Sequence, residues 1–134
     1  MFRLVMLALS ATTLVHGCDC LTPTVRQARK HADIVFRGRI RGFRDTGKGY
    51  QNVIFTVDRV WKGRVSRTFE MPALREEAAC TGFWPNFLKM GRYLLVYANQ
   101  FPDSTDYMTD ICSRTAPVED SKDFRELGSG HQPD

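Results

Sequence analysis

Apolar and polar residues alternate with a period of two along much of this chain, which is typical of half-buried β-strands. In the first such segment, residues 33–42, Ile34 and Phe36 fall on one face and Arg37 and Arg39 on the other. The same alternation and a high content of β-branched and aromatic residues predict further strands at residues 50–61, 65–71, 92–98 and 106–112.

Glycine-rich turns separate the first three of these strands, at residues 45–49 and 62–64. The segment Thr22-Pro23-Thr24 is a helix start signal and predicts a short helix over residues 25–31, and residues 117–127 are expected to form a polar helix. Several curved strands with little helix predict an all-β fold with short flanking helices. A small closed barrel is expected, because closure removes edge strands that would otherwise aggregate.

Residues 1–17 have the features of a signal peptide: one basic residue, Arg3, then an apolar run, then small residues up to Gly17. Cleavage after Gly17 would leave a mature chain of 117 residues, enough for one domain. The predicted organisation is a signal peptide at 1–17, a single monomeric domain at 18–127 and a flexible tail at 128–134.

The mature chain would carry 18 basic and 15 acidic side chains, a net charge of +3, which favours acidic partners only weakly. It contains no second apolar run of the ~20 residues that a membrane-spanning helix needs. These features predict a secreted protein. The alternative is a bacterial lipoprotein, because Leu14 to Cys18 loosely resembles a lipoprotein signal in which Cys18 is acylated.

All four cysteines, Cys18, Cys20, Cys80 and Cys112, follow the predicted leader. An even number of cysteines in a short exported chain predicts two disulfides, whereas a structural zinc site would usually show two C-x2-4-C pairs. A bond between Cys18 and Cys20 would close a strained ring. Each of these two cysteines is therefore expected to pair with Cys80 or Cys112, and the residues alone leave the order open.

Five segments and Cys80 occur in an order that resembles the netrin-like domain, in particular the inhibitory N-terminal domain of the tissue inhibitors of metalloproteinases. The segments are C-x-C at 18–20, ADIVFRGRI at 32–40, FTVDRVWKG at 55–63, GRYLLVYA at 91–98 and CSRT at 112–115. The resemblance implies an OB-like closed barrel of five strands. It also implies disulfides Cys18–Cys80 and Cys20–Cys112, which would staple the N-terminus to the barrel.

By the same resemblance, the protein is a metalloproteinase inhibitor in which Cys18 chelates the zinc of the target protease and Asp19 enters its specificity pocket. A catalytic zinc keeps one position open, and the α-amino nitrogen and carbonyl oxygen of a terminal residue form a five-membered chelate. The family carries a small hydroxyl residue where this chain has Asp19, which disfavours apolar pockets and leaves targets with a basic pocket. The alternative is that the C-x-C motif only staples the terminus.

Four arginines, Arg37, Arg39, Arg41 and Arg44, are expected near one strand face, with Arg26, Arg29 and Lys30 close in sequence. They suggest a second function, a non-inhibitory interaction module that binds a protein or an acidic glycan. The alternative is an ordinary solvated surface. Nucleic acid is excluded as a partner, because the chain is exported and its aromatic residues fall on inward positions.

No H-E-x-x-H, G-x-S-x-G or phosphate-binding glycine loop is present, so the protein is not expected to be an enzyme or to hold a cofactor or metal of its own. Asp58 and Asp110 have no partner evident in the sequence and are expected to be solvated. The aromatic residues expected in the core are Phe36, Phe55, Trp61, Trp84, Tyr93 and Tyr97.

Overall fold

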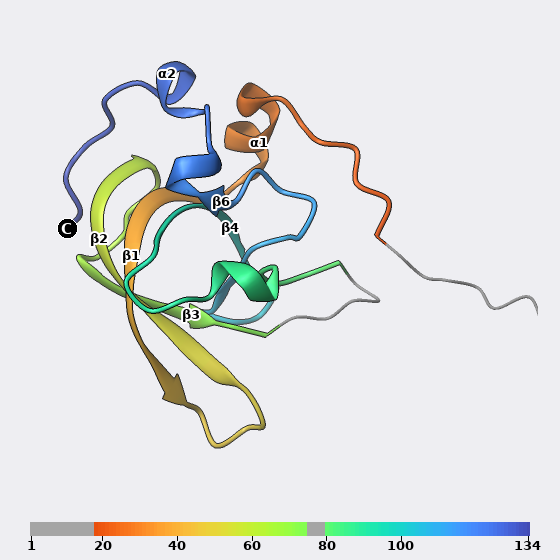
Figure 1. Cartoon of the computed structure of the whole chain (residues 1–134), viewed down its shortest axis with the longest axis vertical. Coiled ribbons are helices and arrows are strands. Elements are labelled where there is room, and N and C mark those ends of the chain that lie inside the picture. The colour runs from red at the N-terminus through yellow and green to blue at the C-terminus, as the bar shows by residue number, and fades with distance from the viewer. Residues whose placement is uncertain (1–17, 75–79) are drawn as a thin grey trace, which may run out of the picture.

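The computed structural model describes residues 18–74 and 80–134, and the predicted signal peptide lies outside the described residues. The chain is mostly β, with a curled antiparallel sheet that forms half a barrel and two short helices at one end of it (Figure 1). The bounds of the elements are α1 Val25–His31, β1 Ile34–Asp45, β2 Gln51–Lys62, β3 Thr68–Pro72, η1 Pro85–Phe87, β4 Tyr93–Gln100, β5 Tyr107–Met108, β6 Ala116–Pro117, η2 Val118–Asp120 and α2 Phe124–Leu127.

The order of strands in the sheet is β3-β2-β1-β4-β5, and β6 also pairs with β4. The long strands β1 and β2 form a twisted hairpin that extends beyond the rest of the sheet (Figure 1). Register shifts interrupt this pairing at three places, and irregularities of this kind increase twist and bend a strand. At one of them, Gly38 packs so closely that a Cβ there would lie 3.1 Å from the Cβ of Phe55. The absence of a side chain at Gly38 therefore lets the sheet curl over its own core.

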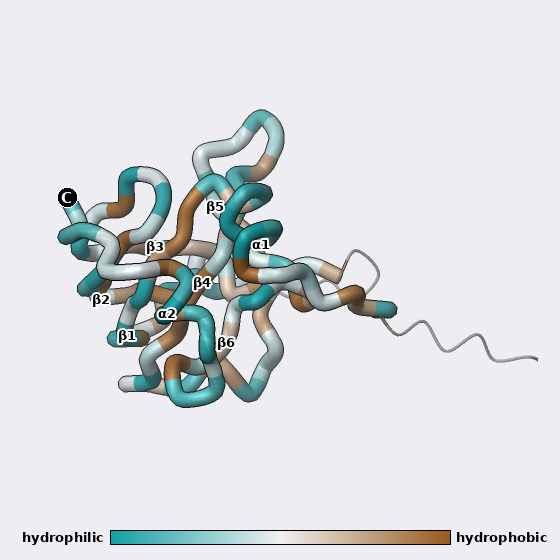
Figure 2. Tube along the Cα trace, turned by 90° about the horizontal axis from the view of Figure 1, so that it is seen from above, coloured by the Kyte–Doolittle hydropathy of each residue, from teal (hydrophilic) through white to brown (hydrophobic). Residues whose placement is uncertain are grey.

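The concave side of the sheet encloses the larger hydrophobic core, and the brown hydrophobic stretches of Figure 2 run along the strands. Its fully buried residues include Ile34, Phe36, Ile40, Phe55 and Val96. The period of two thus predicts the inward face correctly. Among the described residues no hydrogen-bonded ladder joins β3 to β5. These strands approach each other through the rings of Phe69 and Tyr107, whose centroids are 5.7 Å apart. The structure therefore shows a half-barrel, and a closed barrel stays a prediction.

A second, smaller core lies between the outer side of the sheet and the helices. It contains Val35, Trp61, Leu95 and Tyr97, with Leu127 from α2 packed against them. The face of β1 that carries the arginines is therefore buried at Val35, where the helices cover it, and emerges into solvent only further along. Burial on both sides explains why β4 is so apolar: Leu94, Leu95 and Val96 are all fully buried.

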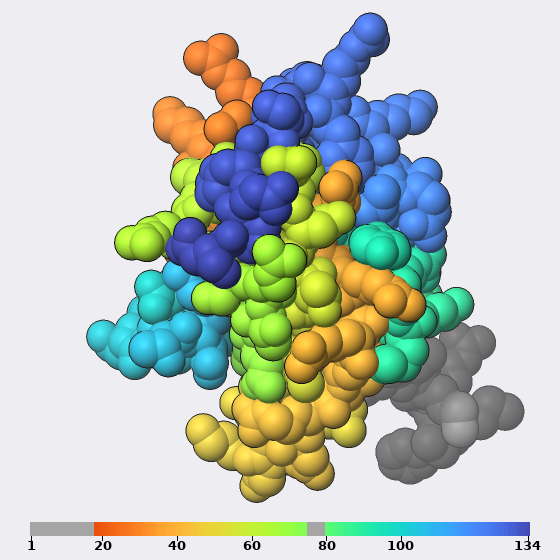
Figure 3. Space-filling view, turned by 90° about the vertical axis from the view of Figure 1, so that its left-hand side faces the viewer, coloured from red at the N-terminus to blue at the C-terminus, as the bar shows by residue number. Residues whose placement is uncertain are grey.

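Two expectations about the C-terminal part differ from the structure. Residues 117–127 form no continuous helix but strand β6, the 3-10 helix η2 and the single-turn helix α2. Residues 128–134, expected to be a loose tail, are hydrogen-bonded to the rest of the domain: His131 exchanges two backbone bonds with Val60, and the N–H of Asp134 donates to Val65. Figure 3 shows these dark blue residues lying on the yellow-green surface of β2.

Candidate functional site

The Cys18-Asp19-Cys20 segment is held to the domain at both cysteines. Cys18 is bonded to Cys80, 62 residues away, with 5.8 Å between the Cα atoms. Cys20 is bonded to Cys112, 92 residues away, with 4.9 Å between the Cα atoms. This is the pairing that the family resemblance implies. Asp19 lies between the two bonds and is exposed, so its carboxylate faces solvent from a segment that is fixed on both sides.

The two cysteines that receive these bonds lie on segments that are themselves joined by backbone hydrogen bonds. The N–H of Ile111 donates to the carbonyl of Cys80, and the N–H of Gly82 donates to the carbonyl of Thr109, both at 2.9 Å. Cys112 follows directly after this ladder. Because both anchors belong to one hydrogen-bonded unit, the disulfides fix the N-terminal segment relative to a single part of the domain.

Helix α1 fixes the other end of the N-terminal segment. The side chain of Thr24 accepts from the N–H of Gln27 at 3.2 Å, and the side chain of Gln27 accepts from the N–H of Thr24 at 3.0 Å. This reciprocal pair is a capping box, which satisfies two backbone donors at the helix start. Only three residues connect Cys20 to this cap, and among them Leu21 is 95% exposed.

A buried carboxylate, Asp123, helps to hold the backbone at Pro23, between Cys20 and α1. It is 2% exposed and accepts three hydrogen bonds: from the hydroxyl of Tyr97 at 2.8 Å, from Nε of Arg114 at 2.8 Å and from Nη2 of Arg114 at 2.5 Å. Arg114 also donates from Nη1 to the carbonyl of Pro23 at 3.0 Å. The guanidinium therefore links the carboxylate to the backbone just before α1.

The local environment changes the acidity of both donors. Burial, and then the hydrogen bond to Asp123, raise the pKa of Tyr97, so its phenol is held neutral. The hydrogen bond to Asp123 also raises the pKa of Arg114. Sequence reasoning missed this cluster because Asp123 lay within an expected polar helix. The only available signal was Arg114, which is part of the CSRT segment of the family resemblance.

The predicted basic stripe is partly neutralised by the protein's own carboxylates. Nε of Arg37 lies 2.9 Å from Oδ1 of Asp58, and its guanidinium carbon lies 5.9 Å from the ring centre of Trp61 and 5.8 Å from that of Phe124. Asp58, expected to be solvated without a partner, is thus paired. Arg37 therefore packs between Trp61 of the sheet and Phe124 of α2 in addition to its ion pair at the surface.

Arg44, further along β1, makes a bidentate ion pair with Glu70, whose shortest contact is 2.8 Å. The hydrogen bond to Arg44 lowers the pKa of Glu70. Of the other two arginines, Arg39 donates weakly to the carbonyl of Gly91 at 3.4 Å, and Arg41 is exposed. Among the described residues, Arg39 and Arg41 thus form no ion pair, although the charge of Arg41 also acts on Glu70.

Two aromatic residues expected in the core lie at the surface. Trp84 is 39% exposed, although its Nε1 donates to the carbonyl of Ile111 at 3.1 Å, and Tyr93 is 45% exposed. Asp110, expected to be solvated, accepts from the N–H of Cys112 at 2.6 Å. Trp84 and Asp110 therefore contact the backbone of residues 111–112, next to the second disulfide.

Across residues 18–74 and 80–134, no three His, Cys, Asp or Glu side chains gather to hold a metal ion. None of the helices in this part of the chain is long and apolar enough to cross a membrane. The two disulfides indicate an extracellular or otherwise oxidising environment.

Comparison with known proteins gives no family assignment. No protein-family model matches the chain, and no curated protein sequence is significantly similar to it. The netrin-like resemblance therefore rests on the order of the segments quoted above, and the function has to be argued from the geometry of the site.

Proposed function

We propose that the protein is a secreted inhibitor of zinc metalloproteinases and that its mature form begins at Cys18 after removal of residues 1–17. The α-amino nitrogen and carbonyl oxygen of Cys18 would displace water from the open position of a protease zinc. The amine must be neutral to donate, and α-amino groups have a pKa of about 7.7–8.0. Near neutral pH a fraction of the α-amino groups is thus unprotonated and able to bind zinc.

The observation that carries this proposal is the double attachment of the Cys18-Asp19-Cys20 segment. Ordering a flexible terminus on binding would cost affinity, and disulfides at the first and third residues of the mature chain remove that cost in advance. Both bonds lead to the hydrogen-bonded unit around residues 80–82 and 109–112. A staple alone would need only one such bond, whereas presenting a chelating residue benefits from both.

Asp19 determines which target is expected. Its carboxylate is exposed in the free protein, and transfer of a carboxylate into an apolar pocket without a partner is costly. A protease whose pocket beyond the zinc contains a Lys or Arg would instead form a charge-assisted hydrogen bond with it. We therefore assign the inhibitor to targets with a basic pocket.

A closed barrel of the OB type is part of the same proposal. The ring contact between Phe69 on β3 and Tyr107 on β5, with centroids 5.7 Å apart, brings the two ends of the half-barrel together. This approach supports an OB-like closed barrel of the netrin-like class. Amide hydrogen exchange that is slow along both β3 and β5 would support closure, and fast exchange on their facing edges would contradict it.

The proposal requires a particular N-terminus and disulfide pattern, which can be measured directly. N-terminal sequencing of the exported protein should begin at Cys18, and its intact mass should lie four hydrogens below that of the reduced chain. Non-reducing peptide mapping should join Cys18 to Cys80 and Cys20 to Cys112. A diacylglyceryl mass increment would establish the lipoprotein alternative, in which the Cys18 sulfur forms a thioether and cannot pair with Cys80.

Inhibition is tested on a panel of zinc endopeptidases with apolar and basic pockets. One alanine added before Cys18 should abolish inhibition, because the α-amine leaves the five-membered chelate, and N-terminal acetylation should do the same. Asp19→Thr should gain about 1–3 kcal/mol of binding toward apolar pockets. Asp106→Thr, which removes the same charge from an exposed position without a side-chain hydrogen bond among the described residues, is the matched control and should change nothing. Equal inhibition by the extended protein would refute chelation.

A further inference from the structure

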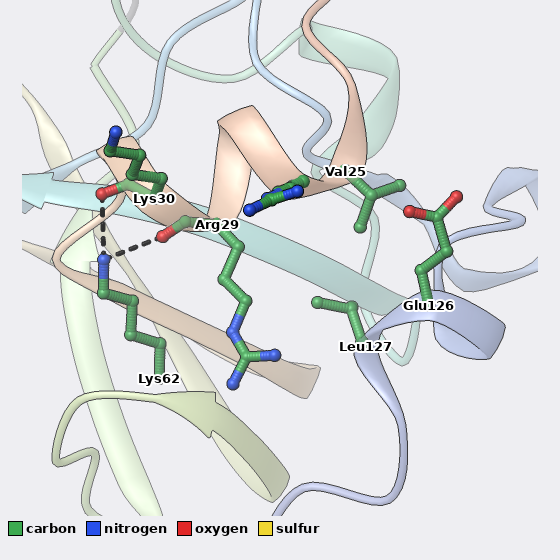
Figure 4. A pocket seen from close by; sticks show the side chains of 7 residues that line it. Val25, Arg29, Lys30, Lys62, Glu126 and Leu127 are labelled. Atoms are coloured by element: carbon green, nitrogen blue, oxygen red, sulfur yellow. Dashed lines mark hydrogen bonds between the residues drawn. The ribbon is translucent and has the colours of Figure 1, made fainter.

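A hollow of about 630 Å³ lies between α1, α2 and the end of β2 (Figure 4). Four cationic side chains line it: Arg26, Arg29 and Lys30 from α1, and Lys62 from the last position of β2. We propose that this hollow is an anion-binding site for a sulfated glycan. The site is distinct from the arginine stripe of β1 and does not depend on protease inhibition.

Backbone contacts fix two of the four cations. Nζ of Lys62 donates to the carbonyls of Arg29 at 2.7 Å and Lys30 at 3.0 Å, which ties β2 to the end of α1 (Figure 4). Arg29 donates one N–H group to the carbonyl of Trp61 at 3.1 Å and has further N–H groups for a ligand. Because these positions are set before binding, a ligand does not bear the entropic cost of ordering them.

The charges in the hollow are not neutralised by the protein. Among the described residues, no carboxylate forms an ion pair with Arg26, Arg29, Lys30 or Lys62, and Glu126 is the only acidic residue that lines the hollow. The stripe on β1 differs, since two of its arginines pair with acidic residues. Four cations without an ion pair in the described part of the chain thus lie together at this end of the sheet, where the side chains of α1, drawn in orange, project from the surface (Figure 3).

The floor of the hollow decides the class of ligand. It is made by Val25 and Leu127, which are 7% and 5% exposed. Little apolar surface is left for a ligand to cover, so an amphiphile with a hydrocarbon tail gains little here. Four cations spread over an open hollow match a ligand with several fixed charges. The disulfides indicate an extracellular or oxidising environment, and polysulfated glycans supply such charges there.

Heparin is the probe, immobilised for surface plasmon resonance. Arg26→Ser/Lys30→Ser removes two cations whose side chains form no hydrogen bond or ion pair among the described residues. Binding should weaken about tenfold, since each cation at a polyanion surface contributes on the order of a factor of three to five. The matched control, Lys48→Ser/Lys89→Ser, removes the same charge from two exposed positions that belong neither to the hollow nor to the arginine stripe. It should stay within about twofold, because exposed charges beyond a Debye length of about 8 Å are screened.

A charge change of opposite sign provides an independent test. Glu126→Gln removes the one acidic side chain that lines the hollow within residues 18–74 and 80–134, and it should tighten heparin binding about threefold. Asp106→Asn, the remote control, should leave binding unchanged. Equal losses in the two double variants would overturn the proposal. So would unaltered binding by Glu126→Gln. Binding to phosphatidylserine vesicles but not to heparin, with loss in Arg26→Ser/Lys30→Ser, would replace the glycan with a membrane surface.

Discussion

The buried carboxylate of Asp123 makes the sharpest stability prediction. Asp123→Asn keeps the shape of the side chain but removes the charge that Arg114 and Tyr97 surround. Removing one partner of a buried ion pair costs about 3–5 kcal/mol, because the other charge stays buried. Here the side chain of Arg114 is 25% exposed and also donates to Pro23. We therefore expect the lower end of that range, about 3 kcal/mol.

Tyr97→Phe tests how this energy is divided. It deletes only the hydroxyl, while both bonds from Arg114 to Asp123 remain. A hydrogen bond to a charged group contributes about 1.5–3 kcal/mol, and we expect the lower value because the carboxylate keeps its charged partner. Asp123→Asn should consequently cost about twice as much as Tyr97→Phe. Asp120→Asn, an exposed neighbour, is the control and should stay within about 0.5 kcal/mol.

The assay is guanidinium unfolding of the oxidised protein, with the midpoint and slope measured for each variant. For a domain of this size, a loss of about 3 kcal/mol corresponds to a fall of roughly 10 °C in melting temperature. One contrary result is that Asp123→Asn lowers the free energy of unfolding by less than about 1 kcal/mol, and another is that it lowers it by the same amount as Tyr97→Phe. Either result would refute the claim that the charge of Asp123 is the main contribution of this cluster to stability.

Alkaline pH gives a second measurement on the same cluster. Burial and Asp123 raise the pKa of Tyr97 above its ordinary value of 10.0. The unfolded chain therefore loses the phenolic proton first as pH rises. The stability contributed by the neutral phenol is fully present below pH 10 and is lost progressively above it. The difference in free energy of unfolding between the wild type and Tyr97→Phe should therefore shrink above pH 10. A difference that stays constant with pH would contradict the raised pKa of Tyr97.

Two further predictions concern the sheet. Gly63→Ala should cost about 2–4 kcal/mol in unfolding experiments, because φ is +75° and a Cβ would lie 2.7 Å from the carbonyl oxygen of Asp33. Gly47→Ala, with φ of +72° but nothing within 4 Å, should cost only about 1 kcal/mol, and equal costs would remove the steric explanation. For Glu70, whose pKa is lowered below the ordinary value of 4.5, the unfolded chain binds the proton first as pH falls. The stability lost by Glu70→Gln should therefore be largest above pH 4.5 and vanish in stronger acid.

The strands and the first helix follow from local patterns in the sequence. Alternation at Ile34, Phe36 and Ile40 predicts the buried face of β1, because successive side chains of a strand point to opposite sides. Thr24 before Val25 predicts the start of α1, because a hydroxyl can satisfy a free N–H at the first turn. These signals depend only on neighbouring residues, so they can be recognised in the sequence without knowledge of any tertiary contact.

Partners that lie far apart in the sequence were decided by the tertiary structure. Asp58 meets Arg37 because the register of β1 and β2 shifts between Arg37 and Gly38, and no local pattern announces such a shift. Lys62, expected only as part of a turn, reaches the end of α1 and completes the cationic hollow.

The cysteines and the C-terminal part also could not be placed from the sequence alone. The number and positions of the cysteines predict two disulfides, but which cysteines pair depends on which segments the sheet brings together. Residues 117–127 were expected to form one helix, yet Asp123 forms an ion pair with Arg114, and His131 further along pairs with Val60 of β2. The local sequence determined which segments are strands and where the first helix begins. The curl of the sheet determined which distant residues meet, because it brings backbone groups and charges from far along the chain within hydrogen-bonding distance.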